Sequence, residues 1–225
     1  MFQDDSMEKE YRKYMDRAVI FDLDGTLWDS REEICKIWNR VFEASPETDY
    51  QMSLLDIERL MGKTMEEIGE ILFPVQGEDF QKKIMDQCGA AEVVYLREHG
   101  ALPYDGVRET VDRLKDSYDL YIVSNCQDGY IEAFMEAHGY MGDFDDIEMS
   151  GRTGKGKGEN IRLLMERNHI SKAVYVGDTV GDEKAARQAG IPFIYAAYGF
   201  GRAIRPDCII QEIRDLPEAL DQLME

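Results

Sequence analysis

The stretch AVIFDLDGTLWDS, residues 18–30, joins an apolar run to two closely spaced carboxylates. Residues 18–23, AVIFDL, are mostly apolar, β-branched or aromatic, which predicts a buried strand. Asp22 and Asp24 stand two residues apart at its end. They therefore face the same side, and both can reach one point as the strand gives way to a loop. Gly25 then permits a sharp turn of the chain.

Strands and helices alternate along the chain after residue 100. The predicted strands are residues 118–124, 144–150, 172–178, 192–198 and 207–210. The predicted helices are residues 108–117, 129–139, 158–168, 181–190 and 216–224. This alternation is typical of a parallel sheet that is covered by helices on both faces.

The chain between the first strand and residue 100 has a different pattern. It carries helical patterns at residues 31–44, 54–61, 64–73 and 78–100, and it shows no convincing buried strand. We therefore expect an α/β fold. Its Rossmann-like parallel-sheet core would comprise residues 1–29 and 100–225, and an α-helical cap domain would be inserted at residues 30–99. The charged residues 1–16 would form a short helix or an arm.

The charge of the chain limits its partners. Its 225 residues include 26 Lys and Arg against 46 Asp and Glu, a net charge of −20. Such a surface repels nucleic acid and anionic membranes, and a phosphate site would need local positive charge. The four cysteines are scattered without a CxxC pair, so we expect reduced thiols and a cytoplasmic location. We expect no membrane span, and a monomer or a weak homodimer.

Polar side chains follow several of the predicted strands, at the edge where open parallel sheets bind their ligands. They are Asp22, Asp24, Thr26, Ser124, Asn125, Asp178 and Asp182, with Lys155 and Lys157 in a glycine-rich loop before a helix. Four carboxylates together need compensation to stay ionised, and Mg²⁺ suits carboxylates and water. A metal with Lys and Ser beside it indicates a phosphate site. We expect the carboxylates of Asp22 and Asp178 to lie within about 5 Å of each other.

The order of these motifs resembles that of the haloacid dehalogenase (HAD) superfamily phosphatases, in the branch near phosphoglycolate phosphatase. The motifs are DLDGT at residues 22–26, VSN at 123–125, the Lys155/Lys157 loop and GDTVGD at 177–182. The resemblance extends over roughly residues 17–224, and the helical insert is similar to the family's cap.

The resemblance implies a role for each matching residue. Asp22 would be the nucleophile that carries a transient aspartyl-phosphate, and it would give one oxygen to Mg²⁺. Asp24 would act as general acid and then general base, with its backbone carbonyl on the metal. Ser124 and Asn125 would hold phosphoryl oxygens. Asp178 would complete the metal shell, and Asp182 would bind the metal directly or through water.

Two lysines are candidates for one role, the neutralisation of the phosphoryl group and of Asp22. Lys157 resembles the KGE form of the motif just before a helix, whereas Lys155 fits the spacing of the KPxP form. No proline follows either lysine, which departs from the commoner pattern. We favour Lys157 and keep Lys155 as the alternate.

The expected substrate is a small phosphorylated metabolite, a phosphomonoester. We place Thr26 and Lys63 among the substrate-binding residues, since the Gly62-Lys63 turn between two cap helices could point into the site. One alternative is a phosphomutase on the same site. Met65 disfavours it, because the related mutase branch is expected to carry an arginine there. The other alternative is a non-catalytic regulator that binds a phosphorylated metabolite.

Overall fold

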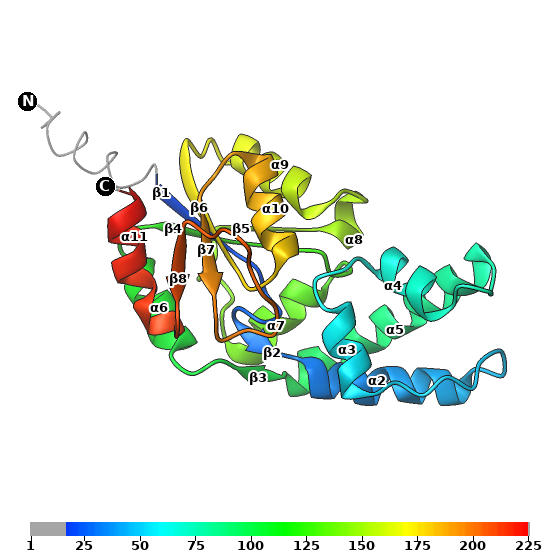
Figure 1. Ribbon diagram of the computed structural model, residues 1–225. Helices are drawn as coiled ribbons and strands as arrows, with labels where there is room; N and C mark the ends of the chain where they lie inside the picture. The colour runs from blue at the N-terminus through cyan, green and yellow to red at the C-terminus, as the bar shows by residue number, and fades with distance from the viewer. Residues whose placement is uncertain (1–16, 225) are drawn as a thin grey trace, which may run out of the picture.

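A six-stranded parallel sheet forms the core in the computed structural model, which describes residues 17–224 (Figure 1). The strands run in the order β5-β4-β1-β6-β7-β8. Their bounds are β1 Arg17–Phe21, β4 Asp119–Ser124, β5 Asp146–Met149, β6 Lys172–Gly177, β7 Phe193–Ala196 and β8 Cys208–Ile210. Strand β1 pairs with β4 on one side and with β6 on the other, so the residues that follow it lie at the middle of the sheet edge.

Strand β1 is buried on both faces, as its continuous apolar run predicts. Ala18 and Ile20 share one apolar cluster with residues of helices α9 (Lys157–Arg167) and α10 (Val180–Ala189). Val19 and Phe21 belong to a second cluster on the opposite face. Helices α6 (Val107–Leu114), α7 (Tyr130–His138) and α11 (Leu216–Met224) contribute to that second cluster. The predicted α/β fold, with helices on both faces of a parallel sheet, is confirmed.

Four helices that follow β1 in the chain, from residue 31 to residue 99, stand together beside the sheet (Figure 1). They are α2 Arg31–Ala44, α3 Leu54–Leu60, α4 Met65–Leu72 and α5 Glu78–His99, and we call them the cap. Between residues 31 and 99 the described structure contributes no strand to the main sheet, which confirms the helical insertion. We keep residues 29/30 and 99/100 as proposed domain boundaries.

Two short strands join the cap to the core. Strand β2 (Trp28–Asp29) pairs antiparallel with β3 (Leu102–Pro103), so the two chain crossings lie side by side. Strands of two residues are too short to produce a sequence period, which explains why the sequence did not indicate them.

Several predicted boundaries differ from the structure by a few residues. Strand β1 ends at Phe21 instead of residue 23, because the chain turns at once: Leu23 O accepts hydrogen bonds from the amides of Thr26 and Leu27. The segment expected to be a basic loop begins with a short helix, α8 (Ser150–Thr153). A 3-10 turn, Ile213–Asp215, leads into α11. The helix or arm expected for residues 1–16 lies outside the described residues.

None of the helices between residues 17 and 224 combines the length and the apolar character that a membrane crossing requires.

Candidate active site

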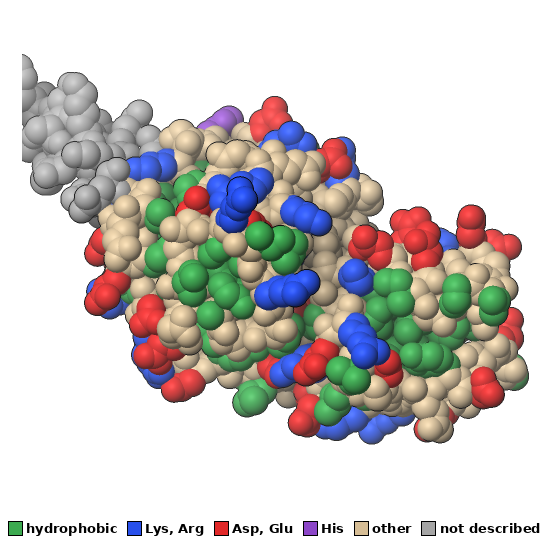
Figure 2. Space-filling view, in the orientation of Figure 1, with side chains coloured by type: hydrophobic (Ala, Val, Ile, Leu, Met, Phe, Trp, Pro, Cys, Tyr) green, Lys and Arg blue, Asp and Glu red, His purple; other side chains and the backbone are tan. Residues whose placement is uncertain are grey.

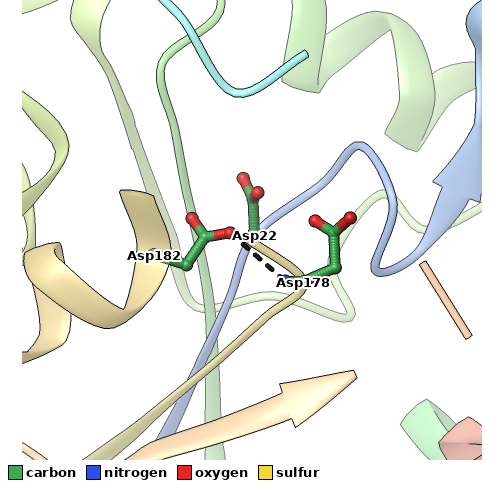
Figure 3. A group of neighbouring side chains, drawn as sticks. All are labelled: Asp22, Asp178 and Asp182. Carbon is green, nitrogen blue, oxygen red and sulfur yellow. Dashed lines mark hydrogen bonds between the residues drawn. The ribbon is translucent and has the colours of Figure 1, made fainter. Parts of the chain in front are cut away.

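Three aspartates meet where the central strands end (Figure 3). Asp22 follows β1, and Asp178 follows the neighbouring strand β6. Asp182 lies in the first turn of α10, the helix that leaves β6. Each offers a carboxylate oxygen, and these three oxygens lie within 4.8 Å of one another. The expected proximity of Asp22 and Asp178 is therefore confirmed.

Asp178 is held through one oxygen only. Its Oδ2 accepts hydrogen bonds from the backbone amides of Phe200 and Gly201, both at 2.9 Å. Its Oδ1 is buried and has no hydrogen-bond partner. A buried carboxylate oxygen without a donor is costly, so this atom needs a cation or water as its partner.

Gly25 lets the chain pass close to that carboxylate. It has φ +82°, and a Cβ at this position would lie 2.4 Å from Asp178 Oδ2. Any larger residue would displace the metal-binding candidate and strain the backbone. The glycine of the opening motif is thus required by both space and conformation.

Both carboxylate oxygens of Asp182 accept hydrogen bonds from nearby donors. Its Oδ2 accepts hydrogen bonds from Thr179 N, Thr179 Oγ1 and Asp178 N, at 2.9, 2.7 and 3.2 Å. Thr179 Oγ1 in turn accepts from Asp182 N, which completes a capping box at the start of α10. Its Oδ1 accepts from Lys157 Nζ. Both oxygens are therefore engaged before any metal is considered.

Of the two candidate lysines, the structure brings only Lys157 into the site. Its Nζ lies 2.8 Å from Asp22 Oδ1 and 2.5 Å from Asp182 Oδ1, and its side chain is only 5% exposed. Lys155 is 46% exposed and pairs with Glu159 at 3.5 Å. Lys157 is the first residue of α9, and its side chain points into the site. Lys155 precedes the helix, and its side chain stays at the surface.

The charges of the site are unbalanced. Burial and the neighbouring Asp182 raise the pKa of Asp22 well above its ordinary value, and they raise the pKa of Asp178 to about 7. Burial alone would lower the pKa of Lys157, but Asp182 and Asp22 raise it. Three carboxylates and one ammonium leave an excess of negative charge when all are ionised. The donor set, all oxygen with one unsatisfied carboxylate oxygen, fits Mg²⁺.

Asp24 is oriented by three donors that all reach the same oxygen. Trp28 Nε1 donates to Asp24 Oδ1 at 2.8 Å. Ser30 Oγ and Tyr130 OH donate to it at 2.5 and 3.0 Å. The carboxyl lines a cavity, and burial raises its pKa. Raising the pKa of a carboxyl prepares it to give a proton near neutral pH. The Trp28 side chain is itself fully buried.

Ser124 and Asn125 line the same cavity from the end of β4. Ser124 Oγ accepts a hydrogen bond from Cys126 N at 3.4 Å. Asn125 Nδ2 donates to Gly62 O at 2.8 Å and thereby joins the core to the cap. Asn125 Oδ1 accepts from Ser150 Oγ. Asn125 is therefore fixed on both sides of its amide.

Thr26 and Lys63 lie in different surroundings. Lys63 lines the cavity, in the turn between α3 and α4. Thr26 is fully buried in the turn after Asp24, its Oγ1 has no partner, and its carbonyl accepts from Tyr198 OH at 2.9 Å. Thr26 is not among the residues that line the cavity, so its role in substrate binding stays a prediction.

The cavity lies between the core and the cap and has a volume of about 50 Å³. Asp22, Asp24, Ser124 and Asn125 line its core side. The cap side is mainly apolar, lined by Ile34, Trp38, Ile57, Leu60, Met65 and Ile68 among others. Two charged side chains of the cap, Lys63 and Glu92, also reach it.

Among the residues of the site that sequence reasoning missed, three come from distant segments of the chain. Tyr130 orients Asp24 from α7, Gly201 binds Asp178 from the loop after β7, and Glu92 lines the cavity from α5. None of them belongs to a local motif. They reach the site only through packing between distant segments, so no sequence spacing could have indicated them.

The fold and the site together define a class of hydrolase. Its features are buried carboxylates at the ends of parallel strands, a buried lysine between them and a helical cap over the cavity. The chain belongs to the haloacid dehalogenase-like hydrolase family, whose sequence profile matches residues 19–196. This confirms the family that the four motifs indicated.

Curated relatives and a solved structure agree with this assignment. Phosphoglycolate phosphatase of Synechococcus elongatus is 28% identical over 92% of this chain and 99% of its own. That of Rhodobacter capsulatus is 28% identical over 81% of this chain and 85% of its own. The crystal structure of a predicted phosphatase from Clostridium acetobutylicum is 25% identical, with a TM-score of 0.79, and covers 92% of this chain and 99% of that one. The protein is thus a hydrolase of the phosphatase type.

Proposed function

We propose that the protein is a Mg²⁺-dependent phosphatase that hydrolyses a small phosphomonoester through a phosphoryl group carried on Asp22. The observation that carries this proposal is the triangle of Asp22, Asp178 and Lys157. It places a candidate nucleophile beside an unsatisfied metal-binding oxygen and a buried ammonium group. Such an arrangement stabilises the charge that develops on a phosphoryl group during transfer.

Each residue then has a defined task. Asp22 attacks phosphorus, and the bond to the leaving oxygen breaks as Asp24 gives that oxygen a proton. Asp24 next takes a proton from the water that cleaves the aspartyl-phosphate and releases phosphate. Lys157, Ser124 and Asn125 bind phosphoryl oxygens.

Mg²⁺ would be held by Asp22, by Asp178 and by the backbone carbonyl of Asp24, and it would supply charge neutralisation for the phosphoryl group. Asp182 has both oxygens engaged, so we infer that it supports the metal through water and fixes Lys157.

The substrate is a small, anionic phosphoester. Its size is supported by the cavity of about 50 Å³, which the cap closes over. Figure 2 shows Lys and Arg side chains on the drawn face near the junction of core and cap, although the chain as a whole is acidic. These charges favour the approach of an anion.

The phosphoglycolate phosphatase relatives support a small phosphorylated metabolite as the class of substrate. Met65 lines the cavity where the mutase branch is expected to carry an arginine, so we do not propose a mutase.

Release of phosphate from a panel of small phosphoesters tests this function, with and without Mg²⁺, for the wild type and for Asp22→Asn. We expect Mg²⁺-dependent turnover that falls by about 10⁴-fold or more in the variant, because the amide cannot act as the nucleophile. Turnover that survives in a folded Asp22→Asn protein would contradict the proposal. Binding of Mg²⁺ measured by calorimetry gives a readout that is independent of activity.

A further inference from the structure

Glu92 is a buried carboxyl group that the proposed chemistry does not use. It lies in α5 of the cap, is 2% exposed, and lines the cavity that Asp22 and Asp24 line from the other side. In the described part of the chain no Lys or Arg forms an ion pair with it. Burial raises its pKa to about 8. Such a group is costly to keep ionised when it is buried without a charged partner.

The protein satisfies Glu92 only in part. Trp38 Nε1 donates to Oε1, and Gln127 Nε2 donates to Oε2 at 2.5 Å. When Glu92 is ionised, each carboxylate oxygen can accept two hydrogen bonds, so each retains one free acceptor site. The two protein donors hold the carboxyl group in a fixed orientation at the wall of the cavity.

Two other buried glutamates show what a purely structural role looks like in this chain. Glu148 pairs with Arg167. Glu183 accepts from the backbone amides of Ile204 and Arg205. Neither is among the residues that line the cavity at the aspartates. Glu92 differs because it borders the cavity and has neither an ion pair, as Glu148 has, nor backbone amide donors, as Glu183 has.

We propose that Glu92 selects the leaving group of the substrate by accepting a hydrogen bond from a hydroxyl or ammonium group on its alcohol part. This inference rests on the proposed phosphatase function. The preferred substrates are phosphoesters of short alcohols that carry such a donor a few atoms from the phosphate. A carboxylate in that place is disfavoured once Glu92 is ionised, because it would add a negative charge beside Glu92 and Asp24, with Lys63 as the one cap lysine lining the cavity.

Four esters that differ only at one end test the inference. They are 2-aminoethyl phosphate, 2-hydroxyethyl phosphate, ethyl phosphate and phosphoglycolate, compared by kcat/KM at a pH above about 8, where Glu92 is ionised. For the wild type we expect the two donor-bearing esters to exceed both ethyl phosphate and phosphoglycolate. Glu92→Gln should reduce kcat/KM for the donor-bearing esters by about tenfold or more and change ethyl phosphate by less than about twofold, since only the former lose a hydrogen bond to a charged group. Glu98→Gln, on the exposed face of the same helix, is the matched control and should leave the order unchanged.

Two results would overturn the inference. One is an equal loss for all four esters in Glu92→Gln, which would show that the residue only holds the cap in place. The other is a wild-type preference for phosphoglycolate or ethyl phosphate over the donor-bearing esters. Hydrolysis of para-nitrophenyl phosphate separates the two proposals, because turnover there supports the phosphatase function whatever the order. No turnover of any ester by the wild type would overturn both.

Discussion

The two walls of the cavity differ in polarity. On the core wall, polar side chains are held by named partners: Asp24 accepts from Trp28, Ser30 and Tyr130, and Asp22 pairs with Lys157. On the cap wall, most side chains are apolar and only Lys63 and Glu92 carry charge. Fixed polar groups suit a reaction whose charges develop at one phosphorus atom, whereas an apolar wall with few polar groups suits recognition of a variable leaving group. Changes on the core wall should therefore affect all substrates, and changes on the cap wall should affect some.

The largest effect after loss of the nucleophile should come from Lys157. Lys157→Met should lower kcat/KM by about 10²–10³-fold for every phosphoester, because a buried ammonium that faces the phosphoryl group is lost. Lys155→Met is the matched control and should stay within about twofold, as expected of an exposed ion pair. Steady-state phosphate release measures both, and circular dichroism confirms that each variant is folded. Equal losses in the two variants would contradict the assignment.

A smaller effect should follow from Tyr130→Phe. The variant keeps the ring that packs edge-to-face on Trp28 but removes one of the three donors to Asp24 Oδ1. We expect kcat to fall about three- to tenfold for an alkyl phosphate, with KM unchanged. The loss should be smaller for para-nitrophenyl phosphate, whose leaving oxygen needs little protonation. A loss that does not depend on the leaving group would show that Tyr130 acts only through packing.

The smallest predicted effect is on the pH dependence of stability, and it comes from Glu92 on the cap wall. Folded Glu92 holds its proton up to about pH 8, whereas the unfolded chain releases it near 4.5. The folded state therefore binds more protons between these values, and its stability declines as the pH rises through that window. Besides its donors Trp38 and Gln127, the charge of Asp24 also acts on Glu92 and raises its pKa.

Glu92→Gln should remove this pH dependence. The difference in melting temperature between the variant and the wild type should shift in favour of the variant as the pH rises from about 5 to 8. The shift should be about 2–4 °C for each kcal/mol by which ionisation of Glu92 destabilises the folded wild type. Differential scanning calorimetry at several pH values measures this, with Glu98→Gln as control. A constant difference between variant and wild type at all pH values would mean that Glu92 is ionised throughout.

The same contrast explains what the sequence could predict. Asp22, Asp178 and Lys157 were found because strand ends and a helix start carry local patterns, and because parallel strands must bring their ends to one edge. The choice of Lys157 over Lys155 rested on motif form alone, and only the inward turn of the chain before α9 separates the two lysines in space.

The cap wall carries no comparable signal. Glu92 sits in a long helix among other charged residues, and its burial depends on how α5 packs against α2 and against the loop after β4. Tyr130 and Gly201 likewise reach the site from segments far along the chain. Contacts set by tertiary packing leave no mark in local periodicity.

The central claim is that the core wall performs phosphoryl transfer through Asp22, and trapping the phosphorylated enzyme tests it most directly. The wild type would be mixed with a good substrate and Mg²⁺, quenched in acid within one turnover, and digested for mass spectrometry. The account predicts a phosphoryl group on the peptide that contains Asp22, lost in Asp22→Asn and retained in Asp24→Asn, where hydrolysis of the intermediate is slow. A phosphoryl group on another residue, or rapid turnover with no phosphorylated peptide in either wild type or Asp24→Asn, would contradict it.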